Sequence, residues 1–182
     1  MRFRVIFSSL VAAIALACVS DRACLAESDN ATKPLVAFTG PDSKIDQPAY
    51  ELVKSKPDWI NLWLRHTRKP PKKDYDEFYN PDRVPEVNFD KCMVIAIFSG
   101  KMTNVAALEA VSVTDGSTAI AFRFRERSYQ TAGPNGGGKA ATPYGLFIVP
   151  RSSKPVVVQE GNKEYKNSTE TWDEVVRLRN AP

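Results

Sequence analysis

The sequence has few of the residues from which many active sites are built. Its 182 residues include a single histidine, His66, and three cysteines. A lone histidine has no second imidazole with which to complete a zinc site, and the Gly-x-Ser-x-Gly turn of the α/β-hydrolases does not occur. Internal repeats, heptads and long low-complexity tracts are also missing. The sequence therefore gives no support to a zinc enzyme, a serine hydrolase, a solenoid or a coiled coil.

The N-terminal segment has the pattern of a secretory signal peptide. Arg2 and Arg4 precede a nearly unbroken apolar run, Val5–Val19, which is too short to be a good membrane span. Cys24-Leu25-Ala26 then places small residues at the −3 and −1 positions. We expect residues 1–26 to be a signal peptide cleaved near Ala26, and the mature protein to be periplasmic or secreted.

A lipid anchor is the alternative for the same segment. Ala15-Leu16-Ala17-Cys18 resembles a bacterial lipobox, so a lipoprotein anchored through Cys18 stays open, and a membrane contact is expected only in that form. Cleavage at Ala26 would leave Cys92 as the sole cysteine and exclude an internal disulfide. It would also lower the formal net charge from +4 to +2, because three arginines and one aspartate leave; no nucleic-acid partner is predicted.

The segment around which the remaining sequence is organised is Met93–Phe98. Its six apolar residues have no polar break, are rich in β-branched types and end at Ser99-Gly100. A strand with one solvent-exposed face would alternate apolar and polar residues, so this pattern predicts a strand covered on both faces. A short helix is the competing interpretation.

Other patterns complete a β-rich prediction. Further strands are expected at Leu35–Phe38 (short), Tyr50–Val53, Val105–Thr114, Ser117–Glu126, Tyr144–Val149 and Val156–Val158. Ser55, Pro57 and Asp58 are helix-start residues, and Trp59, Leu62 and Trp63 at helical spacing predict a helix to about His66, packed on the sheet. Trp172, Val175 and Val176 at similar spacing predict a second short helix.

The predicted fold class is mainly β with two short helices (α+β), arranged as an antiparallel β-sandwich or a partly closed barrel. After the signal peptide we expect a flexible leader over residues 27–47, a β-rich domain over residues 48–160, and a polar linker with the short C-terminal helix over residues 161–182.

Two groups of charged residues have competing interpretations. The basic stretch Arg65–Lys73 is followed at once by Asp74, Asp76 and Glu77, which favours a solvated loop over an anion-binding patch. Arg123 and Arg125 alternate with apolar residues, which favours a solvent face with cross-strand acids over a site for an acidic partner.

Two loops are the candidate contacts with a partner. The first is the turn after the central strand, and the second is a Gly-rich tip that lacks the Gly-Lys-Ser/Thr of a phosphate-binding loop, because Ala140 follows Lys139. The candidate residues are Lys101, Met102, Thr103, Asn104, Pro134, Asn135, Gly136, Gly137, Gly138 and Lys139. No catalytic, cofactor-binding or metal-binding residues are predicted.

Several motifs in order make residues 50–159 resemble the PrcB C-terminal domain family. They are Trp59 and Trp63 on the predicted helix, Val87-Asn88-Phe89, the strand ending at Gly100-Lys101, and Thr142-Pro143-Tyr144. Asn88 stands where the family usually has Asp, and Met102–Val105 replaces its usual Gly-Gly-Tyr turn. The family is named for an accessory subunit of an exported bacterial protease complex.

The resemblance implies an exported, non-enzymatic protein-binding module, an accessory or regulatory subunit of an extracytoplasmic protease. Its expected partner is an exported protease or another envelope protein. Two alternatives stay open: a structural envelope or matrix protein without a protease partner, and a carboxylate-based hydrolase that would use acids such as Asp74, Asp76 and Glu77.

Overall fold

The computed structural model describes residues 31–68, 84–131, 137–162 and 169–179, and these residues form three sheets and one helix. The first four-stranded sheet has the order β1-β8-β3-β2, with β1 at Val36–Gly40, β8 at Tyr144–Pro150, β3 at Cys92–Ser99 and β2 at Pro48–Val53. The second has the order β10-β9-β6-β5, with β10 at Thr171–Leu178, β9 at Val156–Asn162, β6 at Ile120–Ser128 and β5 at Val105–Asp115. Short strands β4, Met102–Thr103, and β7, Ala140–Ala141, form the third.

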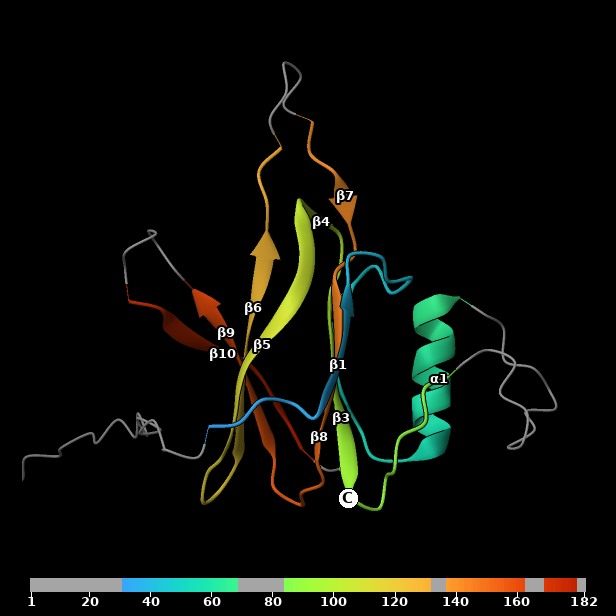
Figure 1. Cartoon of the computed structure of the whole chain (residues 1–182), viewed down its shortest axis with the longest axis vertical. Helices are drawn as coiled ribbons and strands as arrows, with labels where there is room; N and C mark the ends of the chain where they lie inside the picture. The colour runs from blue at the N-terminus through green and yellow to red at the C-terminus, as the bar shows by residue number, and fades with distance from the viewer. Residues whose placement is uncertain (1–30, 69–83, 132–136, 163–168, 180–182) are drawn as a thin grey trace, which may run out of the picture.

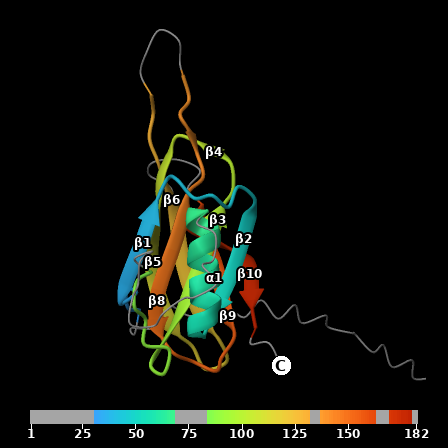
Figure 2. The same cartoon turned by 90° about the vertical axis from the view of Figure 1, so that its right-hand side faces the viewer.

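The two large sheets face each other, and helix α1, Lys56–Thr67, covers the outer face of the first, giving three layers (Figures 1 and 2). Within the described residues the sheets do not join into a closed barrel. The face-to-face packing of the two large sheets agrees with a sandwich.

Strand β3 lies in the middle layer, as its unbroken apolar run predicts. Met93, Ile95 and Ile97 point into the cluster between the two sheets, whereas Val94, Ala96 and Phe98 point into the cluster beneath the helix. All six side chains are fully buried. β8 divides in the same way, with Phe147 on the first side and Leu146 on the second. A strand covered on both faces has no solvent side on which polar residues would be favoured.

The helix is specified locally and positioned by its tryptophans. The Ser55 hydroxyl accepts a hydrogen bond from the amide of Asp58 at 3.3 Å, and Pro57 lies in the first turn, as predicted. Trp59 is 1 % exposed, and its indole Nε1 donates to the carbonyl of Pro85 at 2.8 Å. The Trp63 ring is tilted against the Trp59 ring, 5.5 Å between centroids. Trp59 and Leu62 belong to the buried cluster that contains Val94 of β3, so the predicted packing of the helix on the sheet is confirmed.

The second sheet corrects the prediction that all pairing is antiparallel. β6 pairs with β5 through a hairpin at Asp115-Gly116, but it pairs with β9 in parallel, Ile120 opposite Val156. The chain leaves the second sheet after β6, runs through β8 in the first, and returns as β9. A parallel pair needs such a crossover, which a sequence of hairpin signals does not reveal.

The prediction of a C-terminal helix is wrong: this segment is strand β10, antiparallel to β9. A shift in register between Glu174 and Val176 explains the helix-like spacing. The extra residue at the bulge shifts the alternation of side chains between the two faces of the sheet. Trp172 therefore lies against Arg123 on the outer face, while Val176 packs against the interior cluster. A bulged strand thus places apolar residues four apart on opposite faces, whereas a helix would place them on one. The described part of the chain contains one helix, not two.

The predicted flexible leader is also wrong for the residues that the structure describes. Thr32 exchanges two backbone hydrogen bonds with Val113 of β5, at 2.9 and 2.7 Å, and the next residues enter β1 at the edge of the first sheet. The expected short strand at Leu35–Phe38 is thereby confirmed, shifted by one residue at its start. This segment bridges the two sheets, so the fold begins well before residue 48.

The remaining predicted strands are confirmed with small changes at their ends. The predicted signal peptide, Cys18 and most of the stretch Arg65–Lys73 with Asp74, Asp76 and Glu77 lie outside the described residues. Among the described residues no helix has the length and apolarity that crossing a membrane requires.

Candidate functional site: the β4–β7 end

The two predicted contact loops meet at one end of the sandwich. β4 pairs with β7 in an antiparallel ladder that places Met102 opposite Ala141 and Thr103 opposite Ala140. This small sheet stands beyond the ends of β3, β5, β6 and β8 (Figure 1). We call residues 101–104 together with residues 137–142 the β4–β7 end. Sequence reasoning proposed the loops separately; the structure brings them together.

Asn104 holds the two loops against each other. Its amide donates to the carbonyl of Lys139 at 2.9 Å, and its side-chain Oδ1 accepts from the amide of Lys139 at 2.8 Å. Its own carbonyl accepts from the amide of Tyr129, beyond the end of β6, at 2.9 Å. One residue therefore ties β4 to the segment before β7 and to the chain that leaves β6. The Gly-rich tip is anchored at Lys139.

The backbone turns that build this end require particular residues. Asn104 has φ of 60°, a left-handed conformation that asparagine tolerates better than most residues. Gly100 has φ of 75°, and a Cβ there would lie 2.8 Å from Cδ of Pro48. At Gly138 a Cβ would lie 2.4 Å from Cγ2 of Thr103, whereas at Gly137 it would meet nothing within 4 Å. Two of these glycines are thus needed for close approach.

A shallow cavity of about 490 Å³ opens beside the small sheet. Its lining combines one carboxylate, one ammonium, two hydroxyls and a thioether with small residues: Asp42, Lys101, Met102, Thr103, Ala140, Ala141 and Thr142. Lys101 lies 3.1 Å from the carboxylate of Asp46, and the hydrogen bond and charge of that lysine lower the pKa of Asp46. Such a lining can offer hydrogen bonds and an apolar contact to a ligand surface.

Sequence reasoning missed part of this lining. Asp42 reaches the cavity because the chain after β1 runs beside Thr142, where the two residues form a parallel bridge. No local signal marks that contact, since it depends on two segments 100 residues apart. Ala140 and Ala141 give no chemical signal at all. The candidate residues Pro134, Asn135 and Gly136 lie outside the described residues.

The single histidine lies below this end, inside the layer between helix and sheet. His66 is 5 % exposed; its Nδ1 lies 3.0 Å from the hydroxyl of Ser43, and its ring centroid lies 4.1 Å from that of Tyr144. Burial lowers the pKa of the imidazole. Ser43 is itself buried, and its hydroxyl also accepts from the amide of Ile45 at 3.0 Å. The serine and histidine therefore connect the segment after β1 to α1.

The arginines of β6 have partners on their own sheet, as the solvent-face interpretation predicts. Arg123 donates to Oε1 of Gln159 at 3.0 Å and lies over the ring of Trp172 at 5.0 Å. Arg125 lies 3.4 Å from Glu109 and 3.6 Å from Glu170. These neighbours occupy the arginine row on the outer face of the second sheet.

The described residues contain no group of three or more histidine, cysteine or acidic side chains placed to hold a metal ion. Cys92, at the start of β3, packs partly buried beside the cluster under the helix. Comparison with known proteins gives no further guidance: no family model, no curated protein and no solved structure matches this chain significantly. The resemblance to the PrcB C-terminal domain family stays a prediction.

Proposed function

We propose that this protein is an exported, non-enzymatic binding module that contacts a protein partner through the β4–β7 end. The observation that carries the proposal is the pair of reciprocal hydrogen bonds between Asn104 and Lys139, which joins two loops 35 residues apart in sequence. A surface ordered before binding loses less conformational entropy when a partner arrives. Export rests on the signal-like pattern of residues 1–26.

The chemistry of the β4–β7 end favours contact over catalysis. The cavity lining has no imidazole beside its hydroxyls, Thr103 and Thr142, and the Thr142 hydroxyl already donates to the carbonyl of Ser43 at 2.6 Å. A nucleophile needs a base within hydrogen-bond reach. Met102, a flexible apolar side chain, suits an adaptable protein contact.

The partner that we propose is an exported protease or another envelope protein, and this module would support or regulate it. The basis is the sequence resemblance of residues 50–159 together with the export pattern. The alternative is a structural envelope protein that associates only with itself.

A matched pair of variants tests the proposal. Thr103→Arg places a large cation on β4 in the proposed contact, whereas Thr118→Arg makes the same change at an exposed position in the hairpin at the opposite end of the sandwich. Tagged protein, exported with its own N-terminal segment, is captured from the envelope of its native host and its companions are identified by mass spectrometry. We expect a stoichiometric exported partner with the wild type and with Thr118→Arg, and its loss with Thr103→Arg.

Two results of this capture experiment would contradict the proposal. A partner retained by Thr103→Arg removes the β4–β7 end from the contact. Recovery of only further copies of this chain favours the structural alternative. Circular dichroism of both variants must match the wild type, so that loss of the partner reports the surface and not the fold.

A further inference from the structure

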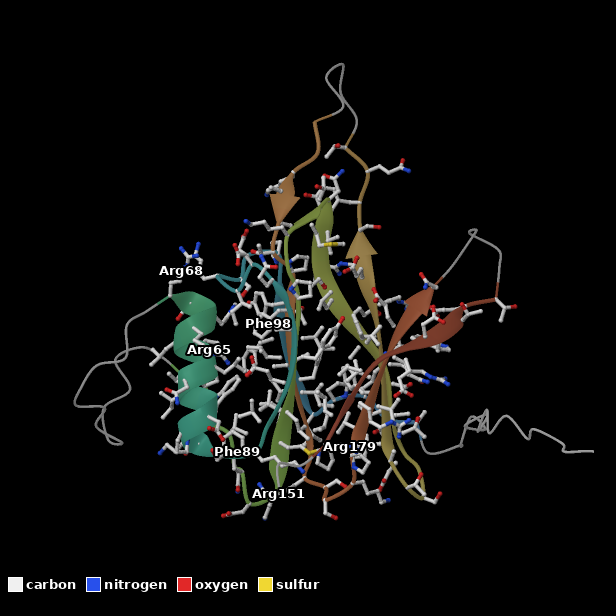
Figure 3. The ribbon with its side chains drawn as sticks, turned by 180° about the vertical axis from the view of Figure 1, so that it is seen from behind. Arg65, Arg68, Phe89, Phe98, Arg151 and Arg179 are labelled. Carbon is white, nitrogen blue, oxygen red and sulfur yellow. The ribbon has the colours of Figure 1, made fainter. Side chains whose placement is uncertain are left out.

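A cavity of about 850 Å³ lies at the other end of the sandwich from β4 and β7. The loops that leave β2 and β8, the turn before β3 and the residue after β10 contribute to it. Cations outnumber acids in its lining, with Lys54, Lys91, Arg151 and Arg179 against Asp58 and Asp90. Figure 3 shows Arg151 and Arg179 at this end. A cavity of this volume is the size of a small-molecule site.

Backbone groups, not acids, fix one of these cations. Nη1 of Arg151 donates to the carbonyl of Lys54 at 3.0 Å and to the carbonyl of Phe89 at 2.5 Å. Within the described part of the chain, Nε and Nη2 of Arg151 make no hydrogen bond, and no carboxylate pairs with this guanidinium. The side chain is thus held in place with donors remaining. A guanidinium fork matches the oxygen pairs of carboxylates and phosphates.

A second cation is crowded against the first. Nζ of Lys54 donates to the carbonyl of Ser152 at 2.5 Å, in the same loop as Arg151. Burial, and then the charge of Arg151, lower the pKa of the Lys54 ammonium. Of the two acids of the lining, Asp58 accepts from the Ser55 hydroxyl at 2.6 Å at the start of α1. An anion in the cavity would be attracted by both cations.

We infer that this cavity binds a small molecule with at least two anionic groups, carboxylates or phosphates, between Arg151 and Arg179. Arg151 supplies a fixed, bidentate contact, and the exposed Arg179, the residue after β10, supplies a second cation of the lining. Lys54 and Lys91 add positive charge to the same lining. The inference is independent of the β4–β7 contact, because the two cavities share no lining residue.

The test uses isothermal titration calorimetry of the exported protein with two probes, citrate and pyrophosphate, at low salt. Citrate reports carboxylates and pyrophosphate reports phosphates, and the tighter probe identifies the source of the anion. Arg179→Gln is compared with Arg177→Gln, which removes the same charge two residues earlier on β10, where Arg177 pairs with Glu174 and lies outside the cavity lining. Arg151→Gln is the second cavity variant.

We expect one of the probes to bind, and Arg179→Gln and Arg151→Gln to weaken it by roughly tenfold each, the loss typical of one charge-assisted contact. Arg177→Gln should change the affinity less than about twofold, since surface charge alone contributes little at a distance. Absence of binding by both probes at millimolar concentration overturns the inference. Equal weakening by Arg177→Gln and Arg179→Gln also overturns it, because binding would then follow net charge and not the cavity.

Discussion

Substitutions at Asn104 separate the two physical roles that the structure gives this residue. Its left-handed backbone, φ of 60°, costs a residue with an ordinary Cβ about 1–2 kcal/mol. Its Oδ1 contact with the Lys139 amide, at 2.8 Å in an exposed setting, contributes about 0.5–1 kcal/mol. Asn104→Ala loses both, Asn104→Gly loses only the side-chain contact, and Asn104→Asp keeps an acceptor on a residue that still tolerates this conformation.

We therefore expect Asn104→Ala to lower the free energy of unfolding by about 2 kcal/mol, Asn104→Gly by about 1 kcal/mol, and Asn104→Asp by less than about 0.5 kcal/mol. Urea denaturation at constant m-value measures the global effect. Hydrogen exchange at the Lys139 amide measures the local one: protection should fall with Ala and Gly and persist with Asp.

Two results would refute this reasoning. Equal destabilisation by alanine and glycine would mean that backbone strain plays no part. Unchanged exchange at Lys139 in all three variants would mean that Asn104 does not hold the β4–β7 end together, and the proposed contact surface would lose its preorganisation.

Three further predictions concern residues in the core of the sandwich and in the layer between α1 and the first sheet. The free energy of unfolding should fall as the pH drops below 6.5, because burial lowers the pKa of His66 in the folded state and the unfolded chain then binds more protons. The contribution of His66 is the difference between the wild-type and His66→Gln plots of unfolding free energy against pH. Parallel plots would contradict the prediction. Gly145→Ala should cost about 1–3 kcal/mol, since the new Cβ would lie 2.4 Å from the Phe147 ring, and Phe147→Leu in the same chain should reduce that cost in a double-mutant cycle; additive losses would argue against the contact. Trp59→Phe should cost about 1–3 kcal/mol in urea denaturation, because the carbonyl of Pro85 loses its indole donor; a neutral result would show that water replaces it.

Local signals made much of the fold predictable. The apolar run Met93–Phe98 implied a strand buried on both faces, and the structure places it in the middle layer for that reason. The Ser55 cap specified where α1 begins, and Asp115-Gly116 specified a hairpin. Each of these features depends on residues close in sequence, whose backbone preferences act before any tertiary contact forms.

The incorrect predictions concern segments whose secondary structure depends on pairing with distant parts of the chain. The spacing of Trp172, Val175 and Val176 satisfies a helix, but pairing with β9 and a bulge after Glu174 make it a strand. The polar residues near Thr32 indicated a loose leader, yet the free edges of two sheets hold them. Tertiary context can override such weak local preferences, because a ladder of backbone hydrogen bonds and buried area outweighs them.

The sequence by itself determined the β-rich class, the central strand, the helix with its tryptophans, and the two loops nominated for contact. Only the tertiary structure decided that those loops form one surface through Asn104 and Lys139, and that Lys54, Arg151 and Arg179 share a cavity at the opposite end. The physical reason is the same in both cases. Strand pairing brings together the ends of strands far apart in the chain, and a linear sequence carries no mark of which ends will meet.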